Sequence, residues 1–330
     1  MKSRIVFFQL LLLHLGLAQQ PSELKPIFEV AGTDSGSRMG QYVKGIGDLN
    51  KDGYADVAVS APRRLKTFVY YGGNPMSSEP ALILEGGGVI VSGDFNGDGW
   101  IDLAIEKWFK DTVLVYYGGE EIDTIPDLIL GAEYSGDLLG YESLAAGDVN
   151  GDGYDDLVIG AQLFPYTGPD AWRGKIYLFG GGANLDSIPR WTAVGDSANF
   201  RLGTRVAVGR VTGGLKAAVV ALGWAPIFNT ANYNLNIYSG KPDFQLTRNL
   251  FYDSRAVPYG FGIGVASFDA DGDGIDDFLV DGIRIFKGGE AMDSLPAHHI
   301  PPPGNDTLSY GKFPRVGGGG DFNGDGSRMC

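Results

Sequence analysis

The chain has 330 residues, of which 44% are hydrophobic and 12% aromatic, and its formal net charge is −14. This composition is sufficient for a hydrophobic core and is not that of a disordered protein. The strong negative charge argues against nucleic acid or an anionic membrane surface as a partner. The 52 glycines indicate many turns, and the single cysteine, Cys330, excludes an intrachain disulfide.

The first residues predict a secretory signal peptide. The start, "MKSR", carries two basic residues and precedes an apolar run over residues 5–17, and small residues at its end suit a cleavage site. That run is too short to cross a bilayer, and no later segment is long and apolar enough to do so. We therefore expect residues 1–18 to be removed and residues 19–330 to be secreted or displayed at the cell surface, without membrane insertion.

An acidic motif recurs along the rest of the chain, as "GDLNKDGYAD", "GDFNGDGWID", "GDVNGDGYDD" and "FDADGDGIDD". A last, incomplete copy, "GDFNGDG", begins at Gly320. The gap between the third and fourth copies is about twice the others, and "GRVTGGLKAAVVAL" in its middle keeps the apolar part without the acids. The period is therefore about 46–62 residues, which indicates a repeat architecture.

Each repeat predicts four short strands. An apolar run leads into the acidic motif, a second such as "ADVAVSAP" follows it, a third such as "TFVYYGG" ends in glycines, and a fourth such as "ALILEG" closes the unit. These β-branched and aromatic runs, bounded by turn residues, are typical of strands. They predict an all-β chain, a β-propeller with about five four-stranded blades plus a truncated sixth. The blades are expected at residues 39–86, 87–132, 139–194, 202–248 and 261–299, with a partial blade at 310–330.

The ends of the chain bear on closure of the ring. Residues 26–43 resemble residues 126–143, where a fourth strand leads into the next first strand. Residues 26–31 are therefore predicted to be an outer strand that completes the last blade. Because the sequence stops inside the sixth repeat, we expect an incomplete ring and a longer parent chain.

The acidic motifs have the composition of calcium loops. Counted from the first Asp, positions 1, 3, 5 and 9 carry Asp or Asn, position 6 is Gly, and position 7 offers a backbone carbonyl. Hard oxygen donors suit Ca²⁺, whereas His and Cys ligands for zinc or copper are absent from these motifs. We expect about four Ca²⁺ sites, which would stabilise a chain without disulfides. The predicted ligands are Asp48, Asn50, Asp52, Tyr54, Asp56, Asp94, Asn96, Asp98, Trp100, Asp102, Asp148, Asn150, Asp152, Tyr154, Asp156, Asp269, Asp271, Asp273, Ile275 and Asp277, with a weaker partial site at Asp321, Asn323 and Asp325.

Two other interpretations of these motifs are weaker. An EF-hand needs Glu at position 12, where this chain has Val59, Ile105, Ile159 and Val280. Simple hairpin turns would explain the Asn-Gly and Asp-Gly pairs but not the further carboxylates at fixed positions.

The repeats resemble FG-GAP repeats, which form the N-terminal β-propeller of integrin alpha chains and occur in many bacterial secreted proteins. The "FG" element is Phe261-Gly262, and loosely Met39-Gly40, Leu139-Gly140, Leu202-Gly203 and Tyr310-Gly311; the "GAP" element is Ser60-Ala61-Pro62 and Gly160-Ala161-Gln162. The resemblance implies calcium loops between the first and second strands of each blade. The acid-free fourth repeat and the missing cysteines depart from the family pattern.

The sequence favours a binding protein over an enzyme. The histidines are His14 in the predicted signal and the pair His298 and His299 in a Pro-rich segment, expected to be a solvated loop. No nucleophile can be placed beside a base, and the carboxylates cluster in the metal loops. We expect a non-catalytic propeller that acts in adhesion or in recognition of a protein or glycan. The alternatives are an accessory propeller of a larger secreted, phospholipase-like hydrolase and a purely structural spacer.

A partner is expected on the face opposite the calcium loops. In such blades the second-to-third and blade-to-blade connections share that face, and here they carry aromatic and Arg side chains, which are frequent at interaction hot spots. Local packing beneath the loops is the competing interpretation. The candidate residues are Phe164, Tyr166, Trp172, Arg173, Trp224, Phe228 and Tyr233, and Asn305 begins a glycosylation sequon that applies in a eukaryotic host.

Overall fold

The structure, a computed structural model, describes residues 4–6, 28–32, 34, 36–212, 217–227, 230–239, 245–253, 265–280, 284–289 and 297–299. Within these ranges the regular structure is almost entirely β-strand, and the exception is a single 3₁₀ turn, η1 (Pro62–Arg64). The prediction of an all-β chain is confirmed.

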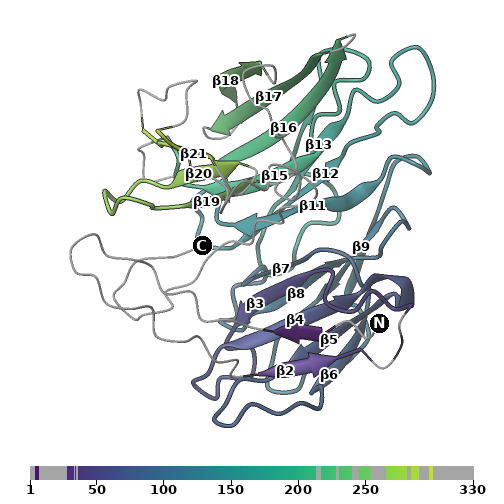
Figure 1. Cartoon of the computed structure of the whole chain (residues 1–330), viewed down its shortest axis with the longest axis vertical. Coiled ribbons are helices and arrows are strands. Elements are labelled where there is room, and N and C mark those ends of the chain that lie inside the picture. The colour runs from purple at the N-terminus through teal and green to yellow at the C-terminus, as the bar shows by residue number, and fades with distance from the viewer. Residues whose placement is uncertain are drawn as a thin grey trace, which may run out of the picture.

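Five four-stranded antiparallel sheets follow one another in chain order (Figure 1). Sheet 1 contains β3 (Val43–Gly47), β4 (Asp56–Ala61), β5 (Lys66–Tyr70) and β6 (Leu82–Glu85), and sheet 2 contains β7 (Ile90–Gly93), β8 (Asp102–Glu106), β9 (Thr112–Tyr116) and β10 (Leu128–Gly131). Sheet 3 contains β11 (Leu139–Gly147), β12 (Asp156–Ala161), β13 (Lys175–Phe179) and β14 (Trp191–Val194). Sheet 4 contains β15 (Arg205–Gly209), β16 (Ala218–Ile227), β17 (Thr230–Ser239) and β18 (Gln245–Asp253), and sheet 5 contains β19 (Val265–Phe268), β20 (Asp277–Val280), β21 (Arg284–Phe286) and β22 (His298–His299).

Each strand pairs with its neighbours in sequence, so every sheet is an up-and-down meander. The second strands are the most deeply buried, and all six residues of β12 lie in the core. This burial explains their nearly continuous apolar sequences, because a strand covered on both faces does not need a polar face.

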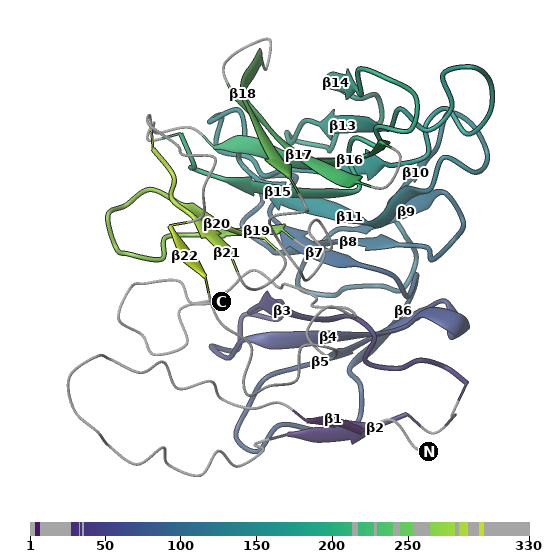
Figure 2. The same cartoon turned by 45° about the horizontal axis from the view of Figure 1, so that its top comes forward.

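The sheets pack against one another through their first strands. β3 contacts β7, β7 contacts β11, β11 contacts β15 and β15 contacts β19, and Figure 2 shows the sheets succeeding one another in chain order. The core is divided accordingly into clusters between neighbouring sheets, such as Val69 and Leu84 of sheet 1 against Leu103 and Leu114 of sheet 2. This is a propeller-like arrangement, and the number of blades and the closure of the ring remain predictions.

The N-terminal strand has a different partner from the predicted one. β2 (Glu29–Ala31) pairs antiparallel with β1 (Arg4–Val6), which lies inside the segment predicted as a signal peptide. The expected partner of this strand belongs to the sixth repeat, residues 310–330, which are outside the described residues. Completion of the last blade by residues 26–31 therefore remains a prediction. The sequon at Asn305 and the pairs Phe261-Gly262 and Tyr310-Gly311 also lie outside the described residues.

Two local expectations are wrong. His298 and His299 do not form a loop but make up β22, which pairs with β21. The segment "GWAPIFNTANY" is not a long connection, because β16 reaches Ile227, β17 begins at Thr230, and Trp224 lies opposite Tyr233 in their ladder. In the part of the chain that is described, no helix has the length and apolar character needed to span a membrane.

Candidate metal loops and the opposite face

The four acidic motifs occupy the same place in four sheets, between the first and the second strand. We number these loops by repeat, as loop 1 (residues 48–56), loop 2 (94–102), loop 3 (148–156) and loop 5 (269–277). Repeat 4 has no acidic loop, and residues 213–216 within its corresponding segment are not described. The partial site at Asp321, Asn323 and Asp325 is outside the described residues.

The Asp at position 1 organises each loop around its carboxylate. In loop 2, Asp94 Oδ1 accepts the N–H of Gly97 at 2.7 Å, and Oδ2 accepts the N–H of Gly99 at 2.9 Å. The corresponding Asp in each of the other loops accepts the same kind of backbone N–H bonds. The chain therefore curls around position 1, and the glycines allow the tight turn.

Positions 3 and 5 extend this arrangement. In loop 2, Asn96 Oδ1 accepts the N–H of Asp98 at 3.0 Å, and Asp98 Oδ1 accepts the N–H of Trp100 at 2.8 Å. The bond to the N–H at position 7 recurs in all four loops. Loop 3 differs at position 3, because the Asn150 amide donates to Asp156 Oδ1 at 3.1 Å instead of contacting position 5.

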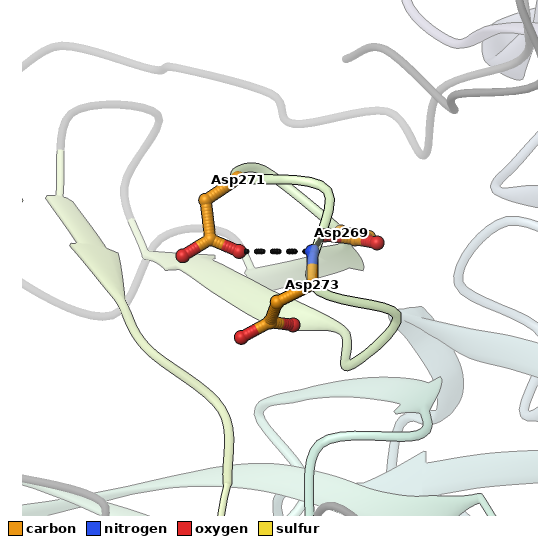
Figure 3. A group of neighbouring side chains, drawn as sticks. All are labelled: Asp269, Asp271 and Asp273. Atoms are coloured by element: carbon orange, nitrogen blue, oxygen red, sulfur yellow. Dashed lines mark hydrogen bonds between the residues drawn. The ribbon is translucent and has the colours of Figure 1, made fainter.

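Loop 5 brings three carboxylates together. One oxygen from each of Asp269, Asp271 and Asp273 lies within 4.8 Å of the others, and Figure 3 shows the three side chains on the tip of this loop. Such proximity is unfavourable for ionised carboxylates unless a cation neutralises them. Lys287 pairs with Asp271 and holds the pKa of that carboxyl below its usual value.

The Asp at position 9 is a predicted ligand that also fixes its loop to the sheet through backbone hydrogen bonds, an arrangement that we call the clasp. These four residues are at most 2% exposed. Each accepts a backbone N–H from position 2 of its loop and one from a glycine after the third strand, at 2.7–3.1 Å, and Asp156 also accepts the N–H of Asn150 at 3.2 Å. Burial raises the pKa of Asp102 and of Asp156 to about 6. The loop is thereby fixed to its own sheet. In loops 1, 2 and 5 each carboxylate oxygen of this Asp accepts one such bond and retains a lone pair for a metal, whereas both oxygens of Asp156 accept a second bond from Asn150.

The glycine that donates to position 9 cannot be replaced without disturbing this clasp. A Cβ on Gly118 would lie 2.2 Å from the carbonyl oxygen of Ile101, at position 8. Gly72, Gly181 and Gly288 meet the corresponding carbonyl at 2.2–2.5 Å. This close approach explains why the third strand of each of these repeats ends in glycine.

Neighbouring loops contact each other through positions 4, 7 and 8. Lys51 of loop 1 lies 3.8 Å from the ring centroid of Trp100 of loop 2, and the ring of Tyr154 of loop 3 covers Gly97 of loop 2. Asp155 Oδ2 accepts the N–H of Asp94 at 2.9 Å, and the Asp155 N–H donates to the Asp94 carbonyl at 3.0 Å. Loops 1, 2 and 3 thus form a continuous row on one face of the molecule.

The donor set of these loops fits a hard divalent cation. Carboxylate and amide oxygens at positions 1, 3 and 5 lie on a tightly turned loop with no nitrogen or sulfur ligand, which is the preference of Ca²⁺. The loops would hold the ion with these side chains, and the ion would neutralise the clustered negative charge.

The residues predicted to bind a partner are partly engaged within the chain. The Phe164 ring lies 5.9 Å from that of Tyr134, with Lys175 above it. Arg173 Nε donates to the Gly195 carbonyl at 2.6 Å, and Arg201 lies 4.9 Å from the ring centroid of Trp172.

The other residues predicted to bind a partner are described by the structure to different extents. Tyr166 is 46% exposed, and its ring covers Gly136. Trp224 and Tyr233 belong to strands whose side chains are not described there, and Phe228 lies outside the described residues.

Sequence analysis missed a second aromatic group on this face. Trp108 and Phe109, in the connection between β8 and β9, contact each other with ring centroids 4.7 Å apart. Phe109 also lies 4.5 Å from the Tyr141 ring of sheet 3. The signal was present in "KWFKD", which occupies the same place in repeat 2 as the aromatic connection of repeat 3.

A buried charged network lies beside these aromatic residues. Glu106 Oε2 accepts the N–H groups of Val89 at 3.1 Å and Glu142 at 3.3 Å, and burial raises the Glu106 pKa to about 7. The Glu142 carboxylate pairs with Arg205 and accepts the Tyr42 hydroxyl at 2.7 Å. Four sheets therefore meet in this network, which no sequence pattern predicted.

Comparison with known proteins identifies the repeats. Residues 48–105 match the profile of the FG-GAP-like repeat, and residues 140–179 match that of the FG-GAP repeat. The chain is similar to integrin alpha-6 of Gallus gallus, with 44% identity over 66 residues, and to integrin alpha-8 of Gallus gallus, with 40% identity over 63 residues. Integrin alpha-6 of Homo sapiens is 43% identical over 68 residues. These matches cover 17–20% of this chain and 6% of each relative. The resemblance to FG-GAP repeats and to integrin alpha chains is confirmed.

Proposed function

We propose that this FG-GAP, integrin alpha-like chain is a non-catalytic, calcium-binding β-propeller that is secreted or displayed at the cell surface. It acts in adhesion or in recognition of a protein or glycan. The observation that carries this proposal is the fourfold recurrence of one oxygen-rich loop at one place in the sheets, with the same internal bonds accepted at position 1 and at position 5. A hairpin turn alone does not require carboxylates at these positions.

Calcium explains the charge distribution of the chain. Four bound Ca²⁺ ions would bring the net charge from −14 to about −6. Extracellular calcium sites have dissociation constants of about 10⁻⁴–10⁻³ M, so each would stabilise the fold by about 0.4–1.4 kcal/mol at about 1 mM calcium. This would act in place of disulfides, which one cysteine cannot form within the chain.

Recognition is assigned to the face opposite the metal loops. That face carries aromatic side chains from sheets 2 and 3, among them Phe109, Tyr134 and Tyr166, each of which is 46–59% exposed. Exposed aromatic rings on a folded surface are typical of contact sites for proteins and glycans. The similarity to integrin alpha chains supports a protein partner and an extracellular location.

The metal assignment is tested by counting calcium. Equilibrium dialysis of the full chain is expected to give about four ions per chain, and Asp152→Ala should remove one of them. Asp170→Ala, an exposed acid on the opposite face, makes the same change in charge and should remove none. A chain that binds no calcium at millimolar concentration, or that loses the same amount in both variants, would overturn the proposal.

A further inference from the structure

The face opposite the metal loops, which we call the recognition face, has one positively charged corner, although the chain as a whole is strongly negative. The segment after β4 reads "PRRLK" over residues 62–66 and ends on the first residue of β5, and the connection after β8 reads "KWFK" over residues 107–110. Both lie at the ends of sheets 1 and 2 that are remote from loops 1 and 2. We call Arg38, Arg63, Lys66, Phe109 and Lys110 the basic corner.

Hydrogen bonds and ring contacts bring these segments into one surface. The Arg63 N–H donates to the Ser37 carbonyl at 3.3 Å, which places Arg38 beside the first connection. The Arg38 guanidinium then lies 5.4 Å from the ring centroid of Trp108. In the second connection, the Lys110 N–H donates to the Lys107 carbonyl at 2.9 Å and closes the turn that presents Phe109.

None of the four cations of the basic corner forms an ion pair within the described residues. Lys66 lies opposite Glu85 in the ladder of β5 and β6, but the Glu85 carboxylate pairs with Lys107. Arg64 and Lys107, which lie beside them, are neutralised by Asp34 and Glu85. The nearby acid Asp111 is oriented by the N–H groups of Gly136 and Leu138, which it accepts at 2.8 Å, but it still counts in the local charge balance. With Arg64 and Lys107 included, six cations stand against the three acids Asp34, Glu85 and Asp111. Arg38, Arg63, Lys66 and Lys110 are exposed and therefore produce a local positive potential.

Phe109 adds an apolar platform to this charge. Its ring is 52% exposed and rests on Tyr141. Its φ is 54°, and that of Asp111 is 51°, so both residues adopt the left-handed conformation that is unfavourable for side chains of this kind. The tip of the connection is thus held by its bonds in a conformation that exposes an aromatic ring between basic side chains.

We propose that the basic corner binds an acidic polysaccharide that carries sulfate or uronic carboxylate groups. Pyranose rings stack on exposed aromatic faces, and their spaced anions would pair with the four free cations. This proposal deepens the recognition role given above and rests on it, but it shares no residue with the calcium loops.

The sheet topology disfavours an acidic peptide as the occupant. Peptides commonly gain affinity by pairing their backbone with a free strand edge. The connections of the basic corner join β4 to β5 and β8 to β9, and these four strands are all internal to their sheets. An acidic peptide therefore cannot bind here by strand addition, and recognition is left to side chains and to the N–H and C=O groups of the two connections. A nucleic acid is the other polyanion that could meet this positive corner, and competition by single-stranded DNA distinguishes it in the test below.

The test measures binding of the full chain to immobilised heparin, a sulfated polysaccharide, in millimolar calcium. Lys66→Glu and Phe109→Ala should each weaken binding by at least about fivefold. The matched control is Arg210→Glu, which makes the same charge change as Lys66→Glu on an exposed residue beside loop 5, and it should leave the affinity unchanged. Thermal melting of each variant establishes that it is folded.

Three results would overturn the inference. The first is that the chain does not bind heparin, and the second is that Lys66→Glu and Arg210→Glu lose the same amount of heparin affinity. The third is that polyglutamate or single-stranded DNA competes as well as free heparin at matched charge concentration. Calcium stoichiometry is measured on the same preparation, so a chain that binds about four ions but no heparin refutes the polysaccharide site and leaves the metal proposal standing.

Discussion

Replacement of Asp155 tests whether neighbouring acidic loops depend on each other. This residue is at position 8 of loop 3, yet its side chain bonds to the backbone of Asp94 at position 1 of loop 2. In Asp155→Ala the acceptor for the Asp94 N–H is lost, while the second bond, from the Asp155 N–H to the Asp94 carbonyl, is retained. The variant also removes a negative charge next to the loop 2 site. Both changes should weaken metal binding at loop 2, although no ligand of that loop is altered.

The expected magnitude follows from the bond that is lost. A hydrogen bond to a charged group contributes about 1.5–3 kcal/mol. Because Asp155 is half-buried and its backbone bond remains, we expect the lower end, about 1.5 kcal/mol, or an affinity at loop 2 about tenfold weaker. Asp155→Asn keeps an acceptor oxygen without the charge, so an intermediate affinity would divide the effect between the hydrogen bond and the charge.

The chain itself provides a readout centred on loop 2, and measurement in an Asp48→Ala background removes the signal of loop 1, whose Lys51 contacts the same tryptophan. Position 7 is Trp in loop 2 only, whereas loops 1 and 3 have Tyr and loop 5 has Ile. Terbium(III), which uses the same oxygen ligands as Ca²⁺, can therefore be titrated with excitation selective for tryptophan, and Trp100→Phe serves as the blank. Asp276→Ala is the matched control, because that position-8 acid accepts the N–H of Arg210 at 2.7 Å in the acid-free repeat 4. A tryptophan-sensitised affinity that stays within about twofold in Asp155→Ala would refute the coupling.

Three further outcomes follow from the described contacts. Asp102→Ala leaves one buried and one partly buried N–H donor unpaired, so it should lower the free energy of unfolding by about 2–4 kcal/mol even in saturating calcium. Urea denaturation measures this change, and a loss below about 1 kcal/mol would contradict the clasp. Removal of calcium with EGTA should destabilise the wild type by about 2–6 kcal/mol relative to about 1 mM calcium, and an unchanged melting temperature would count against the metal sites. Burial raises the pKa of Glu106 from 4.5 to about 7, so its contribution to stability is complete below pH 4.5 and is lost as the pH rises to about 7. The free energy of unfolding of Glu106→Gln, relative to that of the wild type, should therefore rise by up to about 3 kcal/mol between pH 5 and pH 8. A difference that does not change with pH would exclude ionisation of Glu106 as the cause.

The repeat made much of the fold predictable. Each sheet is built from strands adjacent in sequence, so the local pattern of one repeat is sufficient to indicate its four strands. The position of the acidic loops followed for the same reason. Their inner geometry also followed in part, since Asp-Gly and Asn-Gly turns bring positions 1, 3 and 5 to one side.

The strand extension at Trp224 could not be predicted locally. Pro226 lies in that segment, and proline argues against a central strand because it has no N–H to donate. In the structure β15 pairs only with residues 218–222, so at Pro226 one edge of β16 has no neighbour from β15. Proline is tolerated at such an edge, and the pairing with β17 continues through it.

Contacts between sheets left no signal in a single sequence. His298 and His299 become a strand because β21 offers an edge to a segment that has little strand character of its own. Glu106 stands where other repeats have Ser60 and Gly160, and only the approach of sheet 3 supplies the N–H group of Glu142 that it accepts. Such features depend on the packing of one repeat against the next.

The loops divide their polar groups among three tasks, and this division explains how a metal would stabilise the whole molecule. Position 9 ties the loop to its own sheet through buried backbone bonds. In loop 3, position 8 ties it to the preceding sheet through Asp94. Positions 1, 3 and 5 lie between these anchors and provide the oxygens for the ion. A bound cation therefore reduces the repulsion at the junction of two sheets, so its binding energy opposes their separation as well as the unfolding of a single loop.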